Sequence, residues 1–312
     1  MEDETESSIE LTDLDEEGNP IQKKEPKKNI PTNNSKKNYY ILILIIILSL
    51  FIKFYYFNYN RIYYKFENIE DINRNISESI ISLIKKKPNA RIGIIHAKPL
   101  YAIYDYLINK YEKGEISFKD VKFFSFDGIC GLQKDSNSSY YHFLTENFLN
   151  IIDAKKENIF LISEEGYLLF DFKNSADKYN DMLEINPLDL QIILFDENGN
   201  IGLNDEFTDY DLDSHVVKLD VPFRINLKDM YFGTLEKTPI YGITQGIKNI
   251  LETKEIIALG LGKDKAKIVK ILANGVFIKK YPITVLCKHR GNVKVYTDEE
   301  AGSLIEDSYK KF

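Results

Sequence analysis

The feature that most restricts the fold of this 312-residue chain is a regular alternation of strand-like and helix-like segments after Pro88. Short apolar strands are indicated by RIGIIH (91–96), VKFFSF (121–126), DLQIILF (189–195) and EIIALGLG (255–262). Helices are indicated between them, for instance by LYAIYDYLINKYEKG and SYYHFLTENFLNII. This alternation predicts an α/β fold, a doubly wound and mostly parallel sheet with helices on both faces. Binding and catalytic residues in such folds lie at the carboxyl ends of the strands.

The N-terminal region is predicted to contain a membrane anchor. Residues 1–38 are strongly charged and carry few apolar side chains, so we expect them to be disordered. Residues 39–57 contain a single charge, Lys53, and predict a transmembrane helix over 39–58, because a helix needs about 20 residues to cross a bilayer. The stretch lies too far from residue 1 for a signal peptide, whereas a buried core helix stays open. The lysine-rich leading flank favours a single-pass membrane protein with a cytosolic N-terminus.

The segment between this stretch and the alternating region is predicted to connect the two. Ile76, Ile80, Ile81 and Ile84 recur at helical spacing before KKKPNA. Residues 59–89 are therefore predicted to form a stalk or linker helix, and residues 90–312 the folded domain.

The composition limits the partners and cofactors of the chain. A net charge of −7 argues against nucleic acid as the main partner, because a surface that follows phosphates is normally basic. The two cysteines, Cys130 and Cys287, are too few for a disulfide framework or a structural zinc site. No motif indicates a metal site or a cofactor.

Four loops follow the predicted strand ends, namely HAKP (96–99), FDGICGL (126–132), DENGN (196–200) and GLGKDKA (260–266). The third loop has calcium-loop spacing at its start, but Ile201 stands at the sixth position and Phe207 at the twelfth, which excludes a calcium loop. A tight turn at Asn198-Gly199 and a catalytic loop both remain open. The fourth loop opens a helix, where free N–H groups and Lys265 can hold a phosphate.

The order of these loops resembles the glucosamine-6-phosphate deaminase (isomerase) family and its relative, 6-phosphogluconolactonase. The family has Thr-Gly-Gly-Thr-Pro, Asp-Glu-Tyr-x-Gly-Leu, Ser-Tyr and Gly-x-Gly-x-Asp-Gly-His-Ile-Ala-Phe-Asn-Glu-Pro in this order. The matching segments here are IHAKPL, FDGICGL, SYYHFL and ENGNIGLNDE. The resemblance runs collinearly from about Arg91 to Phe312 and implies the fold of that family.

The resemblance also implies the roles of the site residues. The aspartate that moves a proton between C1 and C2 of the sugar matches Asp127. The family histidine that opens the sugar ring, and the aspartate and glutamate that orient it, match Asn200, Asn198 and Asp205 respectively. Asparagine does not titrate near neutral pH, so it cannot replace the histidine as a proton shuttle.

The phosphate-binding residues implied by the resemblance are only partly present in this chain. Lys265 matches a family lysine, whereas the Gly-Gly-Thr backbone is replaced by His96, Ala97 and Lys98. We expect Ala97, Lys98 and Lys265 to contact a substrate phosphate, and the family arginine to match the region of Lys228.

Two functions follow from the resemblance and its departures. The first, favoured by the two asparagines and the lost glycines, is a membrane-anchored pseudoenzyme that binds a sugar phosphate or a partner. The alternative is an active deaminase and isomerase that releases ammonia and fructose-6-phosphate. In both cases the small-molecule partner is a sugar phosphate, and a homo-oligomer remains open.

Overall fold

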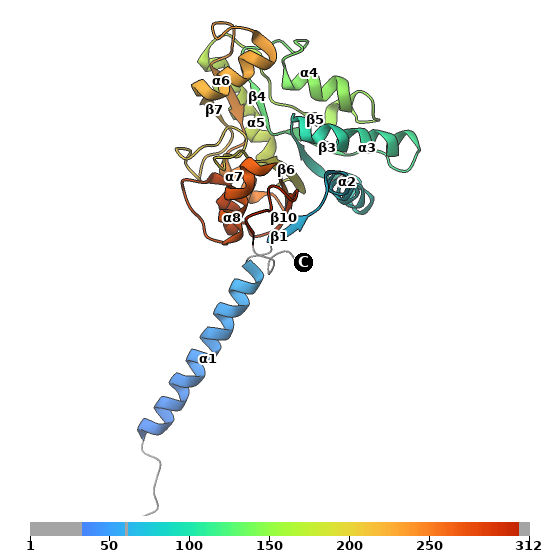
Figure 1. Cartoon of the computed structure of the whole chain (residues 1–312). Coiled ribbons are helices and arrows are strands. Elements are labelled where there is room, and N and C mark those ends of the chain that lie inside the picture. The colour runs from blue at the N-terminus through green and yellow to red at the C-terminus, as the bar shows by residue number, and fades with distance from the viewer. Residues whose placement is uncertain (1–32, 60–61, 306–312) are drawn as a thin grey trace, which may run out of the picture. The chain divides into compact units, whose positions relative to one another are not determined.

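A parallel sheet of seven strands lies at the centre of the fold (Figure 1). The computed structural model describes residues 33–59 and 62–305. All described strand pairs in this sheet are parallel. In spatial order the strands are β1 (Ile62–Phe66), β10 (Asn292–Thr297), β9 (Glu255–Gly260), β6 (Leu190–Leu194), β2 (Arg91–Ile94), β3 (Lys122–Ser125) and β5 (Ile159–Phe160).

The central strands are buried on both faces. Successive residues of β2, β6 and β9 are almost all buried, although their side chains alternate between the two faces of the sheet. Continuous apolar runs of this kind are typical of parallel strands that helices cover on both sides. The predicted α/β fold with a mostly parallel sheet is therefore confirmed.

A second, antiparallel sheet stands beside the carboxyl end of β3. Its strands, in spatial order, are β4 (Asp127–Ile129), β8 (Tyr241–Thr244) and β7 (His215–Lys218). The chain passes from one sheet to the other at Phe126, whose N–H donates to the Ile94 carbonyl and whose carbonyl accepts from the Gln245 N–H, both at 2.9 Å. Asp127 is thus the first residue of the second sheet.

Helices connect the strands, and α2 lies directly beside α3 (Figure 1). The helices are α1 (Asn33–Tyr59), α2 (Ile69–Lys86), α3 (Tyr101–Glu112), α4 (Tyr140–Leu144), α5 (Leu169–Glu184), α6 (Val221–Leu227), α7 (Ile247–Glu252) and α8 (Ala266–Ala273). Short helical turns are η1 (Lys98–Leu100), η2 (Thr145–Leu149), η3 (Lys156–Asn158), η4 (Lys228–Phe232), η5 (Lys263–Lys265) and η6 (Pro282–Lys288).

The segment predicted as a stalk belongs to the folded body. Within residues 59–89, β1 pairs with β10 and extends the central sheet. The isoleucine stripe of α2 is buried in the main core rather than exposed on a connecting helix. Asn68 caps this helix by accepting a hydrogen bond from the Asp71 N–H at 2.9 Å. The body therefore begins before the predicted boundary at residue 90.

The contribution of α2 to stability can be tested at Ile76, which is fully buried. We expect Ile76→Ala to lower the free energy of unfolding by roughly 2–5 kcal/mol, because the change leaves a cavity in the core. Ile69→Ala is the matched control, since Ile69 lies on the same helix but is 45% exposed. Urea unfolding of both variants measures the difference, and equal costs would show that α2 does not belong to the cooperative core.

The described residues contain no helix that combines the length and the apolar character needed to cross a membrane. This finding overturns the predicted single-pass membrane localisation, with its anchor at residues 39–57 and its cytosolic N-terminus.

Part of the predicted disordered tail also lies outside the described residues. Residues 1–32 of the segment 1–38 are not described, and the remaining residues of that segment belong to α1.

Candidate active site

The residues singled out by the sequence follow strands whose carboxyl ends share one edge of the central sheet. His96, Ala97 and Lys98 follow β2, and Asp127 follows β3. The loop Asp196–Asn200 follows β6, and Lys265 follows β9. Because these strands are parallel and adjacent in the order β9, β6, β2 and β3, the topology brings the loops to the same edge.

Asp127 is a buried carboxyl group at the point where β4 begins. The residue is 8% exposed, and its Oδ1 has no hydrogen-bond partner in the described part of the chain. Burial, and secondarily the neighbouring carboxyl of Glu164, raise the pKa of Asp127 from 3.8 to about 7. A carboxyl group with this pKa can both accept and return a proton near neutral pH.

The loop after β6 is a tight turn organised by Asp196. The Asp196 Oδ1 accepts from the backbone N–H groups of Asn198 at 2.9 Å and Asn200 at 2.8 Å. Its Oδ2 accepts from the Asn200 side-chain amide at 2.8 Å. Gly199 has a φ of 78° and donates its N–H to the Asp196 carbonyl at 3.0 Å. The turn predicted at Asn198-Gly199 is therefore present, and it fixes the amide of Asn200 against a carboxylate.

Asp196 was not among the residues singled out by the sequence. Its pKa is raised by burial, against the opposing effect of the hydrogen bonds from Asn200 and Asn198. The family motif has glycine at this position, so the carboxylate is a departure as marked as the two asparagines. An aspartate that opens a turn two residues before Asn198 is a recognisable turn signal, which could have identified it.

Asp205 builds the turn that follows it. Its Oδ1 accepts from the Phe207 N–H at 2.9 Å and from the backbone and hydroxyl of Thr208, both at 3.1 Å. These described contacts are local, and none of them reaches Asn200. The side chain of Asn198 is exposed, and the amide of Asn200 is held by Asp196 rather than by Asn198 or Asp205.

After β2, an aromatic cluster stands where the family has the Gly-Gly-Thr backbone expected to contact the phosphate. The ring of His96 lies 4.4 Å from the rings of both Tyr140 and Phe143, and its Nε2 is 3.0 Å from the Tyr101 hydroxyl. Burial lowers the pKa of His96 to about 4, so the imidazole is neutral at pH 7. Ala97 precedes the helical turn η1, and Lys98 is exposed at its start. Lys98 is thus the cation that this loop offers.

Lys265 stands at the end of η5 with its ammonium group among carboxylates. Its Nζ pairs with Asp264 and lies 3.9 Å from the Glu197 Oε2, so this lysine meets the loop that holds Asn200. The lysine side chain is 17% exposed. Gly262, before η5, donates its N–H to both carboxylate oxygens of Asp298, at 3.1 and 2.9 Å. A phosphate at Lys265 therefore has to displace or outcompete neighbouring carboxylates.

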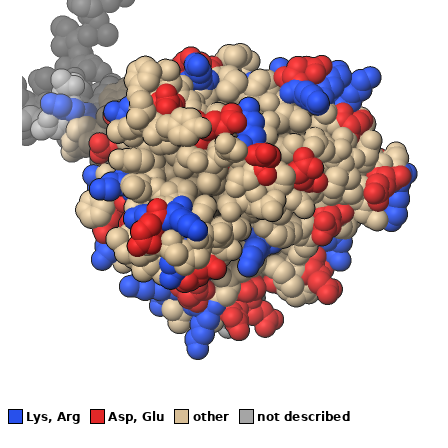
Figure 2. Space-filling model, turned by 90° about the horizontal axis from the view of Figure 1, so that it is seen from above, with Lys and Arg blue, Asp and Glu red and all other residues tan. Residues whose placement is uncertain are grey.

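The expected region of the family arginine lies in η4, where the Lys228 Nζ pairs with the Asp229 Oδ1 at 2.8 Å. On the face shown in Figure 2, cationic and anionic side chains lie interspersed, so the attraction for an anion there is local. Within the described residues, no group of three or more His, Cys, Asp and Glu side chains is placed to hold a metal ion.

No family model matches the chain, but individual proteins of known activity are similar to it. The chain is 34% identical over 241 residues to the glucosamine-6-phosphate deaminase of Thermoanaerobacter sp. (strain X514), covering 77% of this chain and 93% of that protein. It is 30% identical over 240 residues to the glucosamine-6-phosphate deaminase of Mycoplasma mycoides subsp. mycoides SC, covering 77% and 95% respectively.

Solved structures show the same similarity. A monomeric glucosamine-6-phosphate deaminase, described as a missing link of the NagB superfamily, matches with a TM-score of 0.72 and 27% identity over 78% of this chain and 100% of its own. The 6-phosphogluconolactonase of Trypanosoma brucei matches in fold, with a TM-score of 0.63 and 16% identity over 78% and 98%. By sequence and by fold, this chain belongs to the glucosamine-6-phosphate deaminase family as a divergent member.

Proposed function

We propose that the domain binds an amino-sugar phosphate at the carboxyl edge of its sheet and deaminates it slowly, with Asp127 as the base. The reaction would consume glucosamine-6-phosphate and water, and it would yield fructose-6-phosphate and ammonia. The observation that carries this proposal is the buried Asp127 carboxyl, whose pKa is raised to about 7 and whose Oδ1 is unpaired among the described residues.

The chemistry needs a base that can take a proton from C2 and deliver it to C1. A base works best when its pKa lies near the operating pH, because it is then partly unprotonated and its conjugate acid can still give the proton back. The raised pKa of Asp127 meets this requirement, whereas an exposed aspartate would be a weaker base. An unpaired buried oxygen is also available to a substrate without first breaking a protein hydrogen bond.

Ring opening of the sugar is the step for which the site lacks an acid–base group. The amide of Asn200 is held by Asp196 and cannot give or take a proton near pH 7. The open-chain sugar must then form with little help from the protein, and general acid–base groups are typically worth roughly 10²–10⁴ in rate. We therefore infer impaired rather than lost catalysis, and the relatives named as deaminases support activity over a pseudoenzyme.

For the phosphate group, Lys265 and the exposed Lys98 are the proposed cations. Ala97, which lies between Lys98 and the partly buried His96, would supply backbone. The proximity of Lys265 to the loop of Asn200 supports this placement. Neutral His96 contributes no charge, so the phosphate would depend on the two lysines.

Ammonia release from glucosamine-6-phosphate by the full chain tests the proposal. We expect a measurable kcat well below the ordinary enzyme range of about 1–10³ per second. Calorimetric titration with the same sugar phosphate distinguishes the alternatives. Binding without any ammonia would establish the pseudoenzyme, and the absence of both would remove the proposed function.

A further inference from the structure

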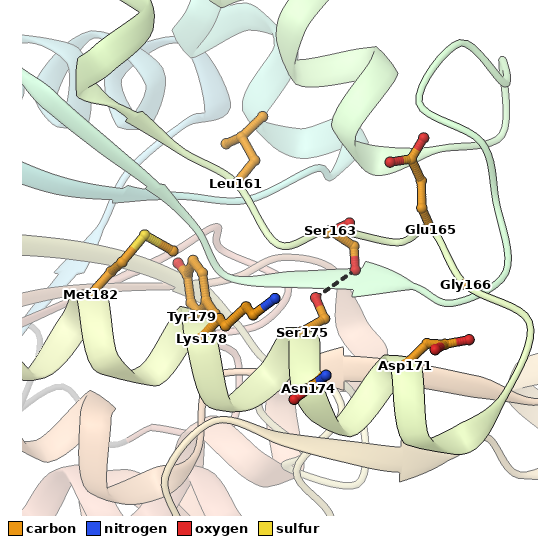
Figure 3. A pocket seen from close by; sticks show the side chains of 10 residues that line it. All are labelled: Leu161, Ser163, Glu165, Gly166, Asp171, Asn174, Ser175, Lys178, Tyr179 and Met182. Carbon is orange, nitrogen blue, oxygen red and sulfur yellow. Dashed lines mark hydrogen bonds between the residues drawn. The ribbon is translucent and has the colours of Figure 1, made fainter.

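The buried carboxyl of Glu164 reaches the site from the extended segment that follows β5. After β5 the chain continues in an alternating pattern, in which Leu161, Ser163 and Glu165 face outward. Figure 3 shows these three residues beside a surface cavity of about 530 Å³ that α5 completes. Ile162 and Glu164 point the other way and are each 2% exposed. The alternation thus turns the Glu164 carboxyl into the protein, toward β4.

Glu164 joins two elements of the candidate site. Its Oε1 accepts from the Ile129 N–H of β4 at 3.2 Å and from the Tyr140 N–H, the first of α4, at 3.1 Å. Its backbone carbonyl accepts from the Gly131 N–H at 2.7 Å. The Oε2 has no hydrogen-bond partner among the described residues. A buried carboxyl that holds only part of its hydrogen-bonding capacity is costly to keep, which points to a role beyond packing.

Both elements that Glu164 joins carry residues of the candidate site. β4 begins with Asp127, and α4 begins with Tyr140, whose ring contacts His96. The two elements pack against each other, and the Asp127 carboxyl, after burial, raises the pKa of Tyr140. Fixing the two backbones to one carboxyl therefore fixes the two side chains relative to each other.

The space beside Gly128 gives a second, independent observation. A Cβ at Gly128 would lie 3.0 Å from the Glu164 Cγ and 3.1 Å from its Oε1, closer than ordinary contact distance. The family motif Asp-Glu-Tyr-x-Gly-Leu has glutamate where this chain has Gly128. In this chain the carboxyl of Glu164 takes the room that a side chain at position 128 would need.

We propose that Glu164 is a positioning residue of the amino-sugar reaction, which holds β4 against α4 and so sets the geometry between Asp127 and Tyr140. The inference rests on the proposed function for its chemistry, but the geometry it assigns can be tested without turnover.

The charge of Glu164 acts on the same groups. Among the described residues, it raises the pKa of Asp127, Cys130 and Tyr140, in each case as a smaller effect than burial. Its own pKa is raised to about 7 by burial, against the opposing effect of the hydrogen bonds that it accepts from the Ile129 and Tyr140 N–H groups. Removing this charge should make Asp127 easier to ionise.

The experiment compares Glu164→Gln with Glu165→Gln in the full chain. Glutamine keeps the shape and an acceptor oxygen but removes the charge, whereas Glu165 is an adjacent carboxylate on the outward side, about half exposed. We expect Glu164→Gln to move the acidic limb of the rate profile to lower pH by about one pH unit. The titration of a ¹³C-labelled Asp127 carboxyl, followed by NMR, should move in the same direction, and the control should change neither.

Glu164→Ala removes the anchor as well as the charge. We expect kcat to fall by roughly 10²-fold with a smaller change in KM, because misplacement of about 1 Å at a reacting group costs about that much. An Asp127 titration that is the same in Glu164→Gln and in the control would overturn the inference. If the wild-type chain releases no ammonia, the proposed function fails, and the NMR titration still decides the role of Glu164.

Discussion

Asp127→Asn is expected to lower the rate of ammonia release by roughly 10²–10⁴-fold, the usual contribution of a general base. The amide keeps the size of the carboxyl group but cannot take a proton from C2 of the sugar. Because binding of the phosphate is proposed to depend on Lys98 and Lys265, the affinity for glucosamine-6-phosphate should change little. The measurement is kcat from ammonia release together with the dissociation constant from calorimetry.

The pH dependence of the wild-type chain tests the same assignment. The carboxylate is the active form of the base, so the rate should rise with pH and reach half of its plateau near pH 7, where Asp127 is half ionised. An ordinary, exposed aspartate would place this midpoint about three pH units lower. A midpoint near pH 4 would contradict the burial and the raised pKa on which the proposal rests.

Asp177→Asn on α5 is the matched control, because Asp177 is exposed and lies outside the proposed machinery. Stability gives a second control. Since folding raises the pKa of Asp127, its contribution to stability is complete below about pH 4 and is lost as the pH rises through about 7. Asp127→Asn should therefore remain folded and should lose less stability between pH 5 and pH 8 than the wild type. If Asp127→Asn is inactive because it is unfolded, its loss of rate says nothing about the role of the carboxyl group. If Asp127→Asn is folded and fully active, Asp127 is not the base.

The central sheet could be predicted from the sequence because burial on both faces leaves continuous apolar runs. The small sheet could not, because β4 has only three residues and gains its order from pairing with a distant strand. The isoleucine stripe of α2 predicted a helix with an apolar face, but periodicity does not say what covers that face. Its role as part of the core, rather than a stalk, depends on contacts that only the folded chain shows.

The candidate site, too, could be predicted from the sequence only in part. Asp127 was identified because a family motif and a strand end coincide there. Its raised pKa was not predictable, because it depends on burial and on Glu164, which is distant in the sequence. Glu164 and Glu165 are adjacent and identical in type, and only the alternation after β5 separates the buried residue from the exposed one. Because the apolar Ile162 marks the inward side of this alternation, the side chain of Glu164, two residues later, could have been predicted to point inward.

Asn200→His is expected to raise the rate of ammonia release by about tenfold or more, because it restores a titratable group where ring opening needs one. In this chain the carboxylate that would orient the imidazole is already present. The Asp196 Oδ2 accepts from the Asn200 amide at 2.8 Å, and a histidine at the same position could donate a ring N–H to it. The single substitution should therefore capture most of the gain.

Asn198→Asp, alone or combined with Asn200→His, is the informative comparison. The side chain of Asn198 is exposed, and its described contact with Asp196 is made by its backbone N–H, so the added carboxylate should contribute little. A gain that appears only in the double variant would show that position 198, rather than Asp196, orients the imidazole. If neither variant gains activity while both bind the sugar phosphate, the obstacle lies at the aromatic cluster around His96. The phosphate would then be held too far from Asp127 for the proton transfer, since an error of about 1 Å can cost roughly 10²-fold.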